Sequence, residues 1–306
     1  MKFSVQSRRE MMLNGLRAIA GLAFVGGCQP LGSGVSQEKV YKEGFKIGIC
    51  DWTLGRIADL SAFEVAKRLG ADGIQADFGM ADDDLPVLHK KCLQKKYIET
   101  VETSGVEIAS FGMVALGWAP YKSDPRWEQW LGEGIEVCRS MGVGIILVPF
   151  FGERDLADDA EGRKIVAEKL SRLGPKAEKA GVVLGLESWM SAEQNMEIIG
   201  KAGSSAVKVY YDVGNSHKKG YDIYKEIRVL GKQICEFHAK DYGHEEFGKG
   251  EIDFRRVREA IDDIGYRGWI VLESSKWEPD KPVSAGEEAV FAKNIAYLRS
   301  VFPPKV

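Results

Sequence analysis

The sequence has little of several patterns that mark common classes of protein. It contains five cysteines in 306 residues. None of them stands in a Cys-x-x-Cys spacing, so neither a disulfide framework nor a cysteine zinc site is indicated. The formal net charge is only -3, without the basic excess that proteins binding nucleic acid usually carry. We therefore expect no nucleic-acid partner.

Glycine-rich phosphate loops and long apolar runs are also missing. No such loop follows any of the short apolar runs that read as strands, which argues against a doubly wound nucleotide-binding sheet. The apolar stretch near the N-terminus covers residues 16–25, which is shorter than the about 20 residues of a membrane-spanning helix. What the chain does have is 44% hydrophobic content, enough for one large domain or two small ones.

The N-terminal residues read as an export signal rather than as part of the fold. Arg8 and Arg9 precede the apolar stretch 16–25, and Cys28 follows it. This order resembles a twin-arginine signal that ends in a lipoprotein-type cysteine. We therefore expect an exported protein that is periplasmic or anchored to the membrane through a lipid on Cys28. A loose amphipathic N-terminal helix is the alternative.

The pattern divides the chain into a signal segment (1–28), a linker (29–43) and a catalytic domain (44–306). In the last part, eight runs rich in β-branched residues alternate with segments of helical spacing. The runs cover residues 46–50, 73–78, 106–111, 144–149, 182–187, 207–212, 234–238 and 269–273. Eight strands with intervening helices predict an α/β protein with a single-domain (β/α)8 TIM barrel. A doubly wound open sheet is the alternative.

Four residues with metal-binding side chains end four successive runs. They are Glu187, Asp212, His238 and Glu273, which lie 25, 26 and 35 residues apart. The carboxyl ends of parallel strands meet at one end of a barrel, so these side chains should gather there. Three carboxylates and one imidazole suit Mn²⁺, Mg²⁺ or a similar divalent ion, whereas a structural zinc site favours cysteine. One such residue alone is more often a helix cap or a salt-bridge partner, but four together favour a metal site.

Strand alternation extends the prediction to neighbouring residues. Glu236, two residues before His238, should point deeper into the barrel, where an unpaired carboxylate is costly. We expect Lys208 on the neighbouring strand to pair with it. Lys240, two residues after His238, should lie at the mouth of the barrel and reach a ligand.

Six segments carry a resemblance to a known family. They are GIQAD at 73–77, LGLES at 184–188, YDVGN at 211–215, FHAKD at 237–241, GKGEIDF at 248–254 and VLE at 271–273. In order and spacing the chain resembles the xylose isomerase-like TIM barrels, the sugar phosphate isomerases and epimerases, over nearly all of residues 45–300. The resemblance implies that Glu187, Asp212, His238 and Glu273 bind one divalent metal ion. Mn²⁺ is expected, with Mg²⁺, Co²⁺ or Zn²⁺ as alternatives.

The resemblance also implies that Glu187 and Glu273 act as acid and base. Removing a proton beside a carbonyl is slow because the enediolate is unstable, and a metal ion that binds both oxygens stabilises the developing charge. One carboxylate removes the proton, and a second on the opposite face returns one, which inverts the carbon. Delivery to the neighbouring carbon gives isomerisation, and loss of a β-leaving group gives a lyase or dehydratase reaction. The residues leave these outcomes open.

The candidate substrate contacts depart from the better characterised epimerases. Asn215 stands where D-tagatose 3-epimerase-like members carry histidine, and His244 stands where they carry arginine, so a ketohexose substrate is not carried over. The residues expected to contact the substrate are Gln75, Trp189, Asn215, His217, Lys240 and His244. Phosphorylated sugars are chiefly cytoplasmic, so export favours a free or keto sugar, such as a 3-keto-glycoside.

Two other classes of protein were weighed for the same barrel. Endonuclease IV-type enzymes need a trinuclear zinc site with several further histidines, whereas this chain has four histidines in all. A sugar-binding lipoprotein without catalytic activity remains open, because a metal site can orient a ligand without turnover. No stretch of the sequence identifies an interface between copies of the chain.

Overall fold

The computed structural model describes residues 44–80, 86–276 and 281–304. The predicted signal segment with Cys28 and the predicted linker lie outside these residues, so export and lipidation stay predictions. None of the helices in the three ranges combines the length and the apolar character that a bilayer crossing requires.

Eight parallel strands close into a barrel in which each strand pairs with its neighbours in chain order. The closure is made by β8 beside β1. The strands are β1 (Lys46–Cys50), β2 (Gly73–Asp77), β3 (Glu107–Gly112), β4 (Ile145–Phe150), β5 (Val183–Ser188), β6 (Val207–Asp212), β7 (Ile234–Ala239) and β8 (Trp269–Leu272). The predicted (β/α)8 barrel is confirmed, and no strand end differs from its predicted position by more than one residue.

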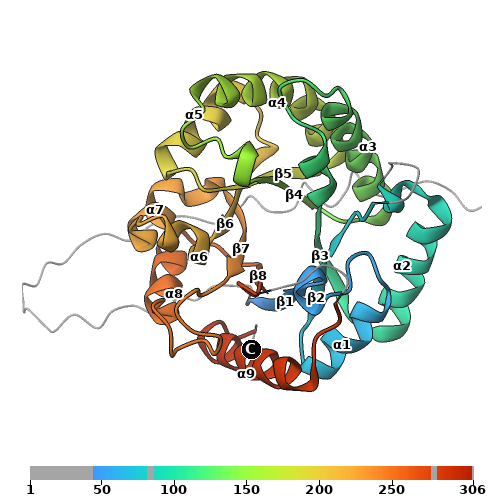
Figure 1. Cartoon of the computed structure of the whole chain (residues 1–306), viewed down its shortest axis with the longest axis vertical. Helices are drawn as coiled ribbons and strands as arrows, with labels where there is room; N and C mark the ends of the chain where they lie inside the picture. Colours follow the sequence, from blue (N-terminus) through green and yellow to red (C-terminus); the bar gives the residue numbers. More distant parts are fainter. Residues whose placement is uncertain (1–43, 81–85, 277–280, 305–306) are drawn as a thin grey trace, which may run out of the picture. The chain divides into compact units, whose positions relative to one another are not determined.

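Helices surround the strands as an outer ring, which Figure 1 shows in a view along the barrel. They are α1 (Ser61–Leu69), α2 (Lys91–Ser104), α3 (Arg126–Met141), α4 (Ala160–Ala180), α5 (Ala192–Ala202), α6 (Val213–Lys218), α7 (Ile223–Leu230), α8 (Phe254–Asp263) and α9 (Ala285–Val301). Helices α1 and α4 end at glycines in the left-handed conformation, Gly70 (φ 83°) and Gly181 (φ 70°). Glycine adopts this conformation without strain, so each helix stops just before the next strand.

The two faces of the strands pack against different kinds of side chain. On β7, Phe237 lies beside Phe254 and Val257 of α8 in the apolar layer between strands and helices. The alternate residues Glu236 and His238 are fully buried on the other face, inside the barrel. The interior of the barrel is therefore partly polar. Its polar residues extend up to the carboxyl ends of the strands.

The pairing of β6 with β7 sets the depth of the interior residues. Val209 pairs with Ile234 and Tyr210 pairs with Glu236, so Cys235 is one extra residue in β7. Such a bulge shifts the register of all later pairs. As a result, the next inward residues, Asp212 and His238, lie directly side by side.

Candidate metal centre

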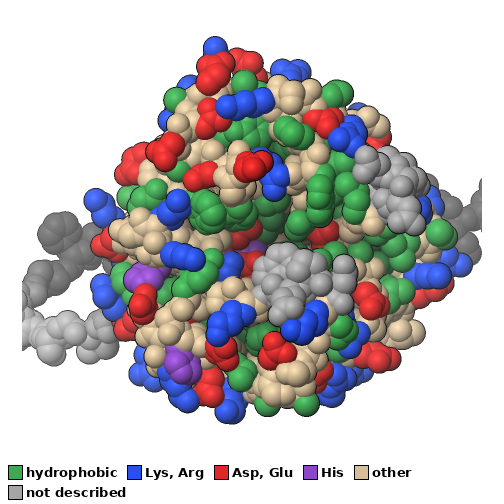
Figure 2. Space-filling model, viewed as in Figure 1, with side chains coloured by type: hydrophobic (Ala, Val, Ile, Leu, Met, Phe, Trp, Pro, Cys, Tyr) green, Lys and Arg blue, Asp and Glu red, His purple; other side chains and the backbone are tan. Residues whose placement is uncertain are grey.

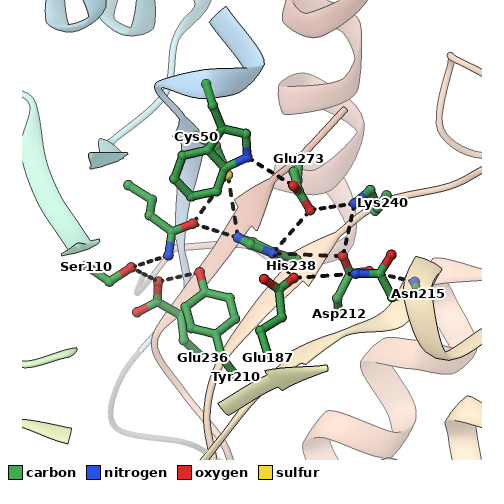
Figure 3. A network of polar contacts seen from close by, with 12 residues as sticks. Cys50, Ser110, Glu187, Tyr210, Asp212, Asn215, Glu236, His238, Lys240 and Glu273 are labelled. Carbon is green, nitrogen blue, oxygen red and sulfur yellow. Dashed lines mark hydrogen bonds and ion pairs between the residues drawn. The ribbon is translucent and has the colours of Figure 1, made fainter. Parts of the chain in front are cut away.

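The four predicted metal ligands come together at the carboxyl ends of their strands. Glu187 lies on β5, Asp212 ends β6, His238 lies on β7, and Glu273 directly follows β8. One candidate ligand atom from each residue lies within 4.8 Å of the others, and all four residues are buried. Figure 3 shows the carboxylates of Glu187, Asp212 and Glu273 gathered around one end of the His238 ring. The predicted juxtaposition is therefore present in the structure.

The distances identify the imidazole nitrogen that faces the carboxylates. His238 Nδ1 lies 2.9 Å from Glu187 Oε1, 3.3 Å from Glu273 Oε2 and 3.9 Å from Asp212 Oδ2. Carboxylates that crowd together without water repel one another and need compensating positive charge. Three buried carboxylate oxygens and one imidazole nitrogen fit a divalent ion that prefers oxygen ligands. These four residues can hold such an ion.

Lys240 supplies positive charge from the side of the cluster. Its ammonium donates to Glu273 Oε2 at 2.7 Å and to Asp212 Oδ2 at 3.4 Å. Burial disfavours the charged form of Glu273, but Lys240 and His238 outweigh it and lower the pKa of that carboxyl to about 2. Burial raises the pKa of Asp212, against the attraction of Lys240. Lys240 thus lies at the mouth of the barrel as predicted, where it is paired with two of the candidate metal ligands.

A hydrogen-bonded chain below the cluster fixes the orientation of His238. Gln75 Oε1 lies 2.6 Å from His238 Nε2, and the amide nitrogen of Gln75 donates to Ser110 Oγ at 2.9 Å. Because the amide oxygen can only accept, Nε2 carries a proton, and Nδ1 is the nitrogen that would bind an ion on the carboxylate side. Cys50 Sγ also donates to Gln75 Oε1, at 3.3 Å.

Gln75 was predicted to contact the substrate, but the structure places it beneath His238. It is fully buried and does not line the cleft above the cluster. Strand β2 carries it beneath His238 because Gln75 lies in the middle of the strand, two residues before the strand's end. Its position suits orientation of a metal ligand, a role that outer hydrogen-bond partners of ligating histidines commonly have.

The same series of hydrogen bonds continues to Glu236, which contacts Ser110 and Tyr210 rather than the predicted Lys208. Glu236 Oε1 accepts from Ser110 Oγ at 2.7 Å and from Tyr210 at 2.8 Å. The predicted pairing with Lys208 is wrong: the Lys208 amine donates to the exposed carbonyl oxygen of Lys232 at 3.0 Å. Tyr210 is the residue in register with Glu236, so its phenol fills the space beside the carboxyl. Burial raises the pKa of Glu236 to about 7, against these two donors.

Three further contacts lie around the carboxylates of the cluster. Trp52 Nε1 donates to Glu273 Oε1 at 2.9 Å. The backbone N–H of Asn215 donates to Asp212 Oδ1 at 2.9 Å, which caps α6. Tyr242 donates its hydroxyl proton to Asn215 Oδ1 at 2.8 Å. The first two contacts orient the carboxylates of Glu273 and Asp212, and the third orients the side chain of Asn215.

A cleft of about 220 Å³ opens above the cluster. Figure 2 shows acidic and histidine side chains deep in a hollow on this face, with hydrophobic side chains along its rim. Of the predicted substrate-contact residues, Trp189, Asn215 and Lys240 line the cleft. The cleft is lined by Trp52, Val114, Gly117, Leu147, Pro149, Phe151, Arg154, Glu187, Trp189, Asn215, Lys240, Tyr242 and Glu273.

Two predicted substrate contacts do not line this cleft. His217 Nε2 lies 3.1 Å from Glu251 Oε2 at the surface. His244 is exposed, and its Nδ1 accepts from the backbone N–H of Glu246 at 2.9 Å. His217 lies on α6 and contacts the segment after β7, whereas His244 is held within its own loop. The structure does not bring either one to the four ligands.

Several cleft residues were not predicted, among them Phe151, Arg154 and Tyr242. Phe151 and Trp189 form an aromatic pair with ring centroids 5.4 Å apart. The loops after β4 and β7 supply Phe151, Arg154 and Tyr242. Loop residues follow no periodic pattern, so nothing in the sequence separates them from ordinary surface side chains.

Solved structures of sugar epimerases share this fold. D-Allulose 3-epimerase from Methylomonas sp. superposes with a TM-score of 0.67 at 16% sequence identity, over 86% of this chain and 99% of that one. 3-Keto-D-glucoside 4-epimerase from E. coli gives a TM-score of 0.65 at 17% identity, over 84% of this chain and 99% of that one. At these identities the likeness shows the fold alone.

Sequence comparison also finds sugar epimerases. The chain is 25% identical to L-ribulose-5-phosphate 3-epimerase of Escherichia coli over 254 residues, which covers 76% of this chain and 85% of that protein. The family model described as a xylose isomerase-like TIM barrel matches residues 63–301. The chain therefore belongs to the xylose isomerase-like TIM barrel family.

Proposed function

We propose that this protein is a divalent-metal-dependent sugar epimerase or isomerase that transfers protons on a keto sugar. The observation that carries the proposal is that only two of the four candidate ligand residues line the cleft. Glu187 and Glu273 line the cleft, whereas Asp212 and His238 lie beneath it and do not. Two of the four residues can therefore reach a substrate, and both carry carboxylates.

The proposed roles follow from this division. When bound, a divalent ion, with Mn²⁺ as our first choice, supplies stabilisation of the negative charge that develops on the substrate oxygens. Asp212 and His238 hold the ion. Glu187 on β5 and Glu273 after β8 are separated by β6 and β7. One of the two carboxylates removes the proton beside the carbonyl, and the other, after taking up a proton from solvent, returns one to the opposite face. Lys240 and Trp52 donate to Glu273 and keep its carboxylate oriented.

The chain's relatives support a sugar substrate of this kind. The similar proteins include epimerases named for a ribulose phosphate, for allulose and for a 3-keto-glucoside. All are sugars with a carbonyl beside the carbon that inverts. Loss of a β-leaving group from a 3-keto-glycoside on the same two carboxylates would make the enzyme a lyase.

Proton exchange with solvent tests the proposed function. We expect the protein with Mn²⁺ to replace one C–H beside the carbonyl with deuterium in D2O, and to form an epimer or isomer, for at least one keto sugar. NMR spectra of a free ketohexose, a ketose phosphate and a 3-keto-glycoside would show this. Release of the aglycone would instead favour the lyase reaction. Sugar binding without exchange would favour a non-catalytic binding protein.

We also propose that the protein is exported, because Arg8, Arg9 and Cys28 resemble a twin-arginine lipoprotein signal. Replacing both arginines with lysine should retain the protein in the cytoplasm, since this signal is read through the arginine pair. Cys28→Ala should move the exported protein from the membrane fraction to the soluble periplasmic fraction. Fractionation of cells followed by immunoblotting measures both effects. An unchanged distribution for the arginine variant would contradict export by this route.

A further inference from the structure

Arg154 brings a second cation into the cleft. It ends a short 3-10 turn, Gly152–Arg154, that follows β4, and its side chain lines the same cleft as Glu187 and Trp189. The other cation of the cleft, Lys240, already pairs with Glu273 and Asp212. Lys240 is therefore already paired with protein carboxylates, and Arg154 is the cation to consider for binding a ligand.

The guanidinium of Arg154 has no hydrogen bond or ion pair with any residue that the structure describes. The adjacent acid, Asp155, is paired with Lys219 instead, at 3.7 Å. Lys219 also lies over the ring of Trp189, 4.5 Å from its centroid. An arginine that is half-buried and lacks a partner keeps its five donors available for a ligand.

The backbone of Gly117 lies close to the guanidinium of Arg154. A Cβ on Gly117 would lie 3.0 Å from Arg154 Nη2, closer than nearly all Cβ contacts. The absence of a side chain at Gly117 therefore lets the guanidinium lie against the turn Val114–Trp118 on the cleft wall. A larger residue at this position would push the end of the Arg154 side chain away.

The charges of the cleft leave Arg154 uncompensated. Glu187, Asp212 and Glu273 carry three negative charges, which a divalent ion and the Lys240 ammonium would balance. With an ion bound, Arg154 would add one positive charge to the cleft. A cleft with such an excess attracts and orients a ligand of opposite charge.

We propose that Arg154 binds an anionic group of the substrate, a carboxylate or a phosphate, so that the natural substrate is an acidic keto sugar. This inference rests on the proposed function and narrows its substrate class. The planar fork of arginine matches the two oxygens of a carboxylate or phosphate. Phe151 and Trp189 line the cleft beside it and offer an apolar wall to the sugar ring. A sugar acid meets this requirement without a phosphate, which is compatible with the proposed export.

Kinetics with three keto sugars of one carbon skeleton test the inference. The set consists of a neutral ketose, its phosphate and its carboxylate derivative, each assayed by deuterium exchange. The wild type should prefer one of the anionic sugars, and the preferred one identifies the source of the charge. Arg154→Gln should raise the KM for that sugar by about 10- to 100-fold, the loss expected for a hydrogen bond to a charged group. The KM for the neutral ketose should stay within about twofold.

Three further variants make the result specific. Arg154→Lys keeps the charge but not the fork and should recover part of the affinity. Gly117→Ala should weaken binding of the anionic sugar while Arg154 is still present. Lys164→Gln, which removes an exposed cation from α4, controls for net charge and should change nothing. An Arg154→Gln variant that binds both anionic sugars as well as the wild type, or that loses the neutral ketose equally, would overturn the inference.

Calorimetric binding separates this inference from the proposed function. If the wild type exchanges protons of the neutral ketose without any preference for an anion, the function stands and the inference fails. If no sugar exchanges, titration with the sugar phosphate and the sugar acid still decides the role of Arg154. Binding of one of them that disappears in Arg154→Gln would support the inference although the proposed function had failed.

Discussion

Replacement of Glu187 or Glu273 with glutamine should slow deuterium exchange of a bound keto sugar by about 10²- to 10⁴-fold, the range of general acid–base catalysis. Glutamine keeps the shape of the side chain and one oxygen but cannot take up a proton near neutral pH. The loss should appear in kcat rather than in KM, because the carboxylates transfer protons in the transition state. NMR of the substrate C–H signal in D2O measures the rate.

The control for this experiment is Glu226→Gln. Glu226 is also buried, but it lies on α7 outside the barrel and accepts from Tyr211 and the backbone of Ala192. Its variant should exchange at close to the wild-type rate. Metal content must be measured for each variant, since a lost ion would slow the reaction for a different reason. Exchange within about threefold of wild type in both metal-loaded cleft variants would refute the assigned roles.

Adding Mn²⁺ to metal-free protein should raise the melting temperature by about 10 °C at a thousandfold excess over Kd. An ion that binds only the folded protein stabilises it by about 4 kcal/mol under these conditions. Asp212→Asn removes one ligand charge and should abolish most of the shift. Gln75→Leu should reduce the shift, because loss of a partner that orients a ligating histidine weakens metal binding about 10- to 100-fold.

Differential scanning calorimetry with and without EDTA measures the shift, and Glu226→Gln again serves as the control. Gln75→Leu also tests the role of the chain beneath His238 separately from catalysis. An equal shift in Asp212→Asn and wild type would show that the ion binds elsewhere. A full shift in Gln75→Leu would show that His238 keeps its orientation without this amide.

The strand ends could be predicted because their pattern has a physical cause. Alternating and apolar runs identify strands, and parallel strands in a barrel bring their carboxyl ends to one side. The convergence of Glu187, Asp212, His238 and Glu273 follows from these two facts alone. The depth of a residue within the barrel is less certain, because the extra residue Cys235 changes which side chains face one another. In the observed register Tyr210, and not Lys208, lies beside Glu236.

Most of the cleft residues that lie on loops could not be predicted, and the reason is also physical. Trp189 and Asn215 follow strand ends closely, so their place in the cleft was within reach of the sequence. His217 on α6 is directed by a contact with Glu251, far along the chain, and His244 by a hydrogen bond within its own loop. Arg154 depends on the turn after β4 and on the missing side chain of Gly117. Neither feature leaves a periodic signal.

The partly polar interior of the barrel sets a limit on how the protein can diverge. Ser110, Glu236 and Tyr210 are joined to His238 through Gln75, so an apolar substitution among them reaches the metal ligand. Phe151, Arg154 and Tyr242 stand on loops that carry none of the four candidate metal ligands. We therefore expect substitutions that change the substrate range to fall in the loops after β4 and β7. Residues in the interior of the barrel should change little in descendants of this chain.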